Sequence, residues 1–163
     1  MKIENEIVIN QAVAAVWAIV GDQFGDAQLW ASALTHTHGH GRAVSGQVCE
    51  SRTCDIKGMG RIREKLLDFD PKRHTLKYEV AEGFPFFVER GVNRWTLTAE
   101  GGATRVQSTA EITTKGILGM LMAPMMKMQM VRLMRQSLEE LKHYVETGTP
   151  HPRKAKALAP ITP

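Results

Sequence analysis

The sequence predicts an α+β fold in which an antiparallel sheet of six to seven strands packs against one long C-terminal helix. Segments in which apolar and polar residues alternate recur along most of the 163 residues, as in half-buried strands. Two short segments with helical spacing follow the first strand. A single long segment with helical spacing comes after the last strand, and it is the only one long enough to cover a sheet.

The first strand is predicted over residues 2–10, where isoleucines alternate with charged and polar residues. Apolar residues at helical spacing over 12–20 predict a short helix that stops near Gly21, and residues 24–34 predict a second one. The two short helices therefore connect the first strand to the rest of the sheet.

The middle of the chain predicts a series of antiparallel strands separated by turn signals. Residues 36–46 are polar and rich in glycine, so we expect a loop there. The clearest alternation places Leu76, Tyr78 and Val80 on one face of a strand. The predicted strands cover residues 47–56, 59–69, 75–81, 88–98 and 105–112.

The long helix is predicted from Pro124, which needs no backbone donor in a first helical turn, to Gly148, which can end a helix in a left-handed conformation. Residues 117–122 are then expected to form a separate short helix. Methionines line the amino-terminal half of the long helix, and methionine is unbranched and adaptable. The pattern fits either a flexible pocket wall or methionines that fill gaps in a core.

Length and composition predict one domain over residues 1–147. The remaining residues, 148–163, are rich in proline and basic residues, so a disordered tail is expected. Much of the formal charge of +4 lies in this tail, which gives no reason to expect nucleic acid binding by the folded body.

The chain contains no apolar run of the length that spans a bilayer, and its first residues carry no apolar signal region. A cytoplasmic protein is therefore expected. Cys49 and Cys54 are five residues apart in one predicted strand, so they point to opposite faces and are expected to remain reduced.

Several stretches over residues 2–147 resemble one known superfamily in their order and spacing. The stretches are VWAIVGD at 16–22, Trp30, IREKL at 62–66 followed by FDP at 69–71, LKYEV at 76–80 with Gly83, and KGILG at 115–119. The chain resembles the START-like or SRPBCC superfamily with the helix-grip fold, and most closely its polyketide cyclase/dehydrase branch. The resemblance implies a curved sheet wrapped around the long C-terminal helix and a cavity between the two, with residues 56–60 and 82–87 as gating loops over the cavity mouth.

Glu64 shares a strand face with Ile62 and Leu66, and the resemblance turns this face toward the cavity. A carboxylate in an apolar pocket requires a raised pKa or a cationic partner, so Glu64 is either an acid/base group or the structural partner of an arginine such as Arg52 or Arg94. Tyr78 is the second candidate for acid/base chemistry. The predicted ligand-binding residues are Trp30, Ile62, Glu64, Leu66, Tyr78, Val80, Phe84, Phe86, Phe87, Trp95, Met122, Met126 and Met130.

His36, His38 and His40 alternate, so an extended chain would place all three on one face, and imidazoles are ligands for zinc or copper. Alternate residues lie about 7 Å apart along a strand, which makes chelation of one ion difficult without a bend. These histidines are weak metal candidates, and no metal or other cofactor is expected.

The leading hypothesis is a protein that binds or carries a hydrophobic small molecule, lipid-like or polyketide-like and aromatic. The alternative is a cofactor-independent polyketide cyclase or dehydratase that uses Glu64 and Tyr78 as acid and base. A second alternative is a protein-interaction module, since exposed aromatic residues also mark interfaces. The chain is expected to be a monomer or a homodimer.

Overall fold

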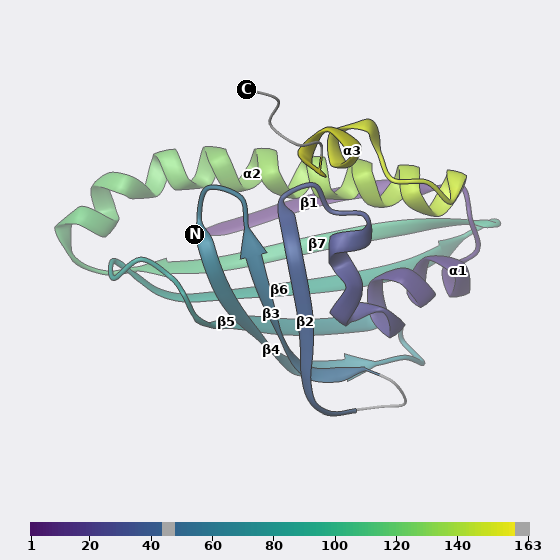
Figure 1. Ribbon diagram of the computed structural model, residues 1–163, viewed down its shortest axis with the longest axis horizontal. Helices are drawn as coiled ribbons and strands as arrows, with labels where there is room; N and C mark the ends of the chain where they lie inside the picture. The colour runs from purple at the N-terminus through teal and green to yellow at the C-terminus, as the bar shows by residue number, and fades with distance from the viewer. Residues whose placement is uncertain (44–47, 159–163) are drawn as a thin grey trace.

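The computed structural model describes residues 1–43 and 48–158. One seven-stranded sheet, with every neighbouring pair antiparallel, has the order β1-β7-β6-β5-β4-β3-β2. The sheet curves, and the long helix α2 runs along one side of it (Figure 1). The strands are β1 (Lys2–Ile9), β2 (Leu34–Ala43), β3 (Cys49–Ile56), β4 (Gly60–Asp70), β5 (Thr75–Glu82), β6 (Val88–Glu100) and β7 (Ala103–Thr114).

The predicted α+β fold is confirmed, and one of its strands replaces an expected loop. The histidine-rich segment forms most of β2, which pairs with β3 through an irregular register. Thr37 explains why the segment is extended, since its side chain is buried and its hydroxyl donates a hydrogen bond to the Gly25 carbonyl at 2.7 Å. Of the predicted strand 47–56, Gln47 lies outside the described residues.

The connection between β1 and β2 contains the short helices that the sequence predicts. The helix α1 (Val13–Trp17) continues into a π-helical turn, η1 (Ala18–Asp22), and a 3₁₀ helix, η2 (Phe24–Leu29), follows. Gly21 permits the tight packing of this connection, because a Cβ atom there would lie 2.4 Å from the Trp17 ring.

The helix α2 (Gly116–Thr147) is continuous over 32 residues and contains Pro124 in its interior. The prediction of a separate short helix over 117–122 is therefore wrong. Pro124 and Met120 are both exposed, so water can reach the Met120 carbonyl that proline leaves without a helical donor. The predicted end is confirmed, since Gly148 has a φ of 71° and its N–H donates to the Tyr144 carbonyl at 2.9 Å.

The main core lies between the concave face of the sheet, the short helices and the carboxyl-terminal half of α2. Leu138 and Leu141 of α2 are buried there against residues such as Trp17 and Val106. The first half of α2 is much less buried than the second half. Gly119 is its single buried residue before Met134.

The predicted disordered tail differs from the structure over residues 152–158, which form the helix α3 (Pro152–Leu158). Its Lys154 is 2% exposed, and the ammonium group donates to the Leu34 carbonyl at 2.6 Å. Arg153 forms ion pairs with Glu140 at 2.9 Å and with Glu139 at 2.8 Å. These contacts hold α3 against α2 and the start of β2, whereas residues 159–163 lie outside the described part of the chain.

Candidate ligand cavity

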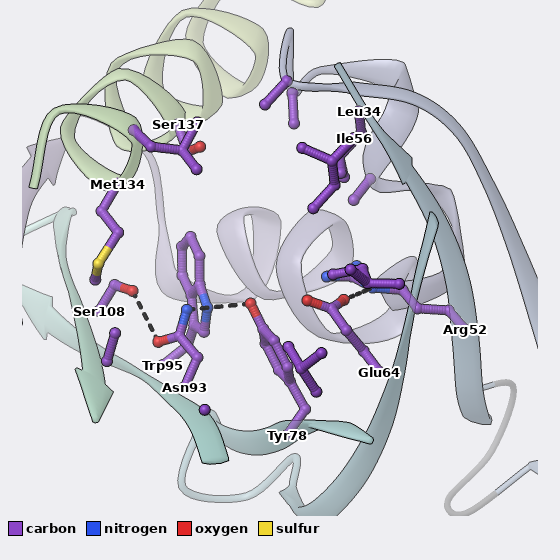
Figure 2. Close-up of a pocket in the computed structure, with 18 of the residues that line it drawn as sticks. Leu34, Arg52, Ile56, Glu64, Tyr78, Asn93, Trp95, Ser108, Met134 and Ser137 are labelled. Carbon is purple, nitrogen blue, oxygen red and sulfur yellow. Dashed lines mark hydrogen bonds and ion pairs between the residues drawn. The ribbon is translucent and has the colours of Figure 1, made fainter. Parts of the chain in front are cut away.

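A cavity of about 180 Å³ lies between the sheet, α2 and the short helices, as the resemblance implied. Its wall is mostly apolar, with a few polar groups that come from neighbouring strands (Figure 2). Residues that face it include Val20, Phe24, Trp30, Leu34, Arg52, Ile56, Ile62, Glu64, Tyr78, Val80, Asn93, Trp95, Ser108, Met130, Met134 and Ser137. A concave apolar site with few polar groups is typical of small-molecule binding.

The strongest charges at the cavity are an ion pair between Arg52 of β3 and Glu64 of β4. These residues are direct partners in the sheet register, and Arg52 Nε donates to Glu64 Oε2 at 2.6 Å. Arg52 Nη1 also donates to the Phe24 carbonyl at 2.5 Å, and its guanidinium lies 4.0 Å from the centre of the Phe24 ring. Burial lowers the pKa of Arg52, but the Glu64 carboxylate, with smaller contributions from Cys54 and Tyr78, raises it by more, so the net shift of that pKa is upward. Arg52 is therefore a permanent buried cation.

A line of three polar side chains crosses the adjacent strands β5, β6 and β7. Asn93 Nδ2 donates to the Tyr78 hydroxyl at 3.1 Å, and the Ser108 hydroxyl donates to Asn93 Oδ1 at 3.1 Å. Burial, assisted by the nearby Glu64 carboxylate, raises the pKa of Tyr78 to about 12. Because the Tyr78 oxygen accepts from Asn93 and keeps its proton, the hydroxyl hydrogen is free to donate to a bound molecule.

Two connections border the cavity where gating loops were expected. Met59, between β3 and β4, lines the cavity although its side chain is 47% exposed. Phe84, between β5 and β6, packs on Gly91 of β6, where a Cβ atom would lie 2.4 Å from the ring. Phe84 therefore covers one side of the cavity, and any larger residue at position 91 would displace it.

The sequence of residues 1–146 matches a protein family described as polyketide cyclase/dehydrase and lipid transport. The chain belongs to this family. A search of curated proteins finds no significant match. The match to the family model confirms the predicted START-like relationship at the level of the family.

Solved structures share the family's helix-grip fold at low sequence identity. A START superfamily protein from Mycobacterium smegmatis superposes with a TM-score of 0.75 at 14% identity, covering 91% of this chain and 99% of that one. The di-domain aromatase/cyclase BexL of the BE-7585A biosynthetic pathway gives a TM-score of 0.72 at 14% identity, covering 90% of this chain and 46% of that one. Norcoclaurine synthase from Thalictrum flavum, in complex with dopamine and hydroxybenzaldehyde, gives 0.67 at 14% identity, with coverages of 86% and 85%.

The structure brings together eight of the predicted ligand-binding residues of this family member. Trp30, Ile62, Glu64, Tyr78, Val80, Phe84, Trp95 and Met130 line the cavity. Glu64 has the arginine partner that was one of its two predicted states, and that partner is Arg52 rather than Arg94.

Five other predicted residues lie outside the cavity lining. Leu66 is buried in the core and contributes to packing. Met122 and Met126 are half-buried on the first half of α2, and α2 borders the cavity only from Met130 onward. Phe86 is 77% exposed and packs edge-to-face on Phe87, at a centroid distance of 5.5 Å, so this pair lies on the outer side of the loop.

Sequence reasoning missed several polar residues of the cavity, above all Asn93, Ser108 and Ser137. Asn93 shares its strand face with Trp95 and Leu97, and Ser108 shares its face with Val106 and Ala110. A polar residue in the apolar half of an alternating strand is the signal that could have identified both. Ser137 occupies the equivalent position on the apolar face of α2.

Two of the three alternating histidines are in contact, since the His38 and His40 rings pack edge-to-face at a centroid distance of 4.7 Å. His36 and His38 are exposed, whereas His40 Nε2 is 2.9 Å from the Thr53 hydroxyl. Among the described residues, no group of three or more His, Cys, Asp or Glu side chains is placed to hold a metal ion. Cys49 and Cys54 are both free thiols, as predicted, and burial raises the pKa of Cys54 to about 12.

Proposed function

We propose that this protein binds a hydrophobic small molecule that carries at least one oxygen function, lipid-like or polyketide-like and aromatic, in the cavity between the sheet and α2. The observation that carries the proposal is the line formed by Tyr78, Asn93 and Ser108 on the floor of a mostly apolar cavity. The apolar wall supplies affinity, and the free Tyr78 hydroxyl hydrogen orients the ligand oxygen. The family description, with its cyclase, dehydrase and lipid transport activities, supports the same ligand class.

The ion pair favours binding over catalysis. One oxygen of the Glu64 carboxylate, Oε2, already accepts a short hydrogen bond from the buried Arg52 guanidinium, which fixes the side chain in the cavity wall as part of a structural pair. Within the described residues, no second acidic side chain lines the cavity.

The binding proposal is tested by fluorescence titration with the neutral dye N-phenyl-1-naphthylamine. Ser137 points into the cavity from α2 (Figure 2), so Ser137→Phe should fill it and weaken dye binding by about tenfold or more. Gln136→Phe is the matched control, because Gln136 is the preceding residue and lies outside the cavity lining. Equal affinities for wild type and Ser137→Phe, or no dye binding by wild type, would contradict the proposal.

The role of the polar line is tested by competition between 2-naphthol and naphthalene for the dye site. Tyr78→Phe should weaken 2-naphthol by about 2- to 10-fold, the value of one net hydrogen bond, and leave naphthalene unchanged. An equal loss for both competitors would assign Tyr78 to packing alone.

A cofactor-independent cyclase or dehydratase is the second candidate, and a specific observation favours it. The second carboxylate oxygen of Glu64 faces the Tyr78 side of the cavity (Figure 2). Glu64 could accept a proton from an activated carbon of the ligand while the Tyr78 hydroxyl donates to the carbonyl oxygen that gains charge. On this candidate, Glu64→Gln and Tyr78→Phe each abolish turnover of a polyketide-like substrate while the protein stays folded. Unchanged rates in both variants would remove these residues from the mechanism.

A further inference from the structure

The first half of α2 carries a continuous apolar surface on the side that faces away from the sheet. We name it the outer patch, and it consists of Ile117, Leu118, Met120, Leu121, Met125 and Met128. Ile117 is 75% exposed, Met120 70% and Leu121 69%. The helix is therefore apolar on both faces here, although only the face toward the sheet is covered. Large exposed apolar patches mark surfaces that bind a partner.

The charged residues on the helix segment that carries the outer patch all have one sign. Residues 115–138 contain Lys115, Lys127, Arg132 and Arg135 and no acidic residue. Lys127 and Arg132 are exposed at the carboxyl-terminal end of the patch, and Lys115 is exposed at its start. The partner that fits this surface is therefore apolar at its centre and anionic around it.

The start of α2, where the outer patch begins, is also attached to a connection that borders the cavity. The Lys115 N–H donates to the Phe87 carbonyl at 2.9 Å, and a Cβ atom on Gly119 would lie 3.0 Å from the same oxygen. The start of α2 is thus fixed to the connection between β5 and β6, whose Phe86 is exposed and whose Phe84 lines the cavity. Figure 1 shows this connection and the start of α2 at the same end of the molecule.

We propose that the outer patch and Phe86 dock this protein on an anionic lipid surface, with the first half of α2 lying flat in the headgroup region. Aliphatic and methionine side chains would enter the boundary of the acyl chains, while Lys115, Lys127 and Arg132 reach anionic headgroups. No helix among the described residues is long and apolar enough to cross a membrane, so the contact is peripheral. The proposal does not depend on what occupies the cavity.

A second copy of the chain fits the outer patch less well. In a symmetric dimer the same patch contacts itself, so the basic residues of α2 would face one another, and residues 115–138 supply no acidic counterpart. An anionic lipid surface supplies the missing negative charge.

The test is flotation of the full chain with vesicles of equal parts phosphatidylcholine and phosphatidylglycerol, compared with phosphatidylcholine alone. The wild type should bind the anionic vesicles, and Leu121→Ser with Met128→Ser should weaken that binding by about tenfold or more. Leu67→Ser is the matched control, since Leu67 is a 41% exposed leucine on β4 and should leave binding unchanged.

The charge requirement is tested with Lys127→Gln and Arg132→Gln, which should weaken binding to the anionic vesicles by roughly tenfold. Lys65→Gln with Lys72→Gln removes two exposed lysines elsewhere and should have little effect. Raising the salt from about 0.01 M to 1 M should also release the wild type, because the screening length falls from about 30 Å to 3 Å.

Three outcomes would overturn the proposal. They are absence of wild-type binding to anionic vesicles, equal binding by wild type and the Leu121→Ser, Met128→Ser variant, and a wild-type dimer that this variant dissociates without any vesicle binding. Since the dye titrations need no lipid and use other positions, failure here and failure of the proposed cavity function are separate results.

Discussion

Arg52 and Glu64 form a buried pair in which neither residue can be replaced alone without consequence. Their side chains are only 8% and 10% exposed. Removal of one partner leaves an uncompensated charge in the cavity wall, whereas removal of both leaves a neutral apolar surface.

Arg52→Met is therefore expected to lower the free energy of unfolding by about 3–5 kcal/mol. Arg52→Met combined with Glu64→Leu should recover most of that loss, because no buried charge then lacks a partner. Urea unfolding of the three proteins measures both effects. Arg61→Met, which breaks the exposed pair with Asp55, is the control and should change stability too little to resolve. A double variant no more stable than Arg52→Met would contradict the interpretation.

Tyr78 should make stability fall in alkaline solution. Its pKa is about 12 in the folded protein and near 10.0 in the unfolded chain, so the folded state holds the proton more tightly. This contribution is fully present below pH 10 and is lost as the pH rises toward 12, with a magnitude on the order of 2 kcal/mol. Tyr78→Phe should remove that part of the alkaline loss in urea unfolding. If the free energy of unfolding falls equally with rising pH in wild type and Tyr78→Phe, the Tyr78 phenol does not have a raised pKa in the folded protein.

At the scale of the elements, the continuous helix α2 has a well-buried second half and a largely exposed first half. Its second half packs on the sheet, while its first half is fixed mainly through Gly119 and the Lys115–Phe87 hydrogen bond. Pro124 lies in the interior of α2, after its first turns and before the residues that line the cavity. Proline is normally found in the first turn of a helix and not in its interior, so the local sequence predicts a helix boundary at this position.

Pro124→Ala is expected to stabilise the protein by about 1–3 kcal/mol, because it restores a backbone donor inside a helix and removes a ring that clashes with the preceding turn. Urea unfolding gives the change, with Lys127→Ala as a control at an exposed position one turn later, where a few tenths of a kcal/mol are expected. No gain from Pro124→Ala would mean that the helix starts at this proline, as the sequence alone suggests.

At the scale of the whole molecule, α3 links parts of the chain that are far apart in sequence. Glu140 of α2 is 1% exposed, and its carboxylate accepts from the Ser32 N–H and hydroxyl at 2.7 Å and from Arg153 at 2.9 Å. Lys154 adds the hydrogen bond to Leu34, whose side chain lines the cavity. Residues 32–34, the last turns of α2 and the helix α3 thus form one polar cluster beside the cavity.

A chain that ends at Thr149 is expected to lose roughly 3 kcal/mol of stability, because the ion pair of Arg153 with Glu140 and the hydrogen bond of Lys154 to the Leu34 carbonyl are both lost. Glu140→Gln in the shortened chain should restore part of the loss, since a neutral amide needs no counter-charge. Thermal or urea unfolding of the full and shortened chains makes the measurement. Identical free energies of unfolding for the two chains would show that α3 contributes nothing to stability, as expected for the disordered tail that the composition predicts.

The sequence by itself determined the features that depend on neighbouring residues. Alternation in β5, β6 and β7 and the helical period from Met126 to Val145 are local patterns, so they predicted the α+β fold, the position of the sheet and the end of α2 at Gly148. They also directed attention to Glu64 and Tyr78, because a polar group in the apolar half of a strand is visible in the sequence.

Only the tertiary structure decided which groups meet across the fold. The choice of Arg52 over Arg94 follows from the register of β3 and β4, and the line from Tyr78 to Ser108 follows from the order of three strands. The strand in the histidine segment depends on a contact with a distant residue, Gly25, which compensates for unfavourable local propensity. The docking of α3 likewise depends on the distant carbonyl of Leu34. The sequence also did not show that α2 lines the cavity only from Met130 onward, because methionines before and after Met130 repeat with the same helical spacing.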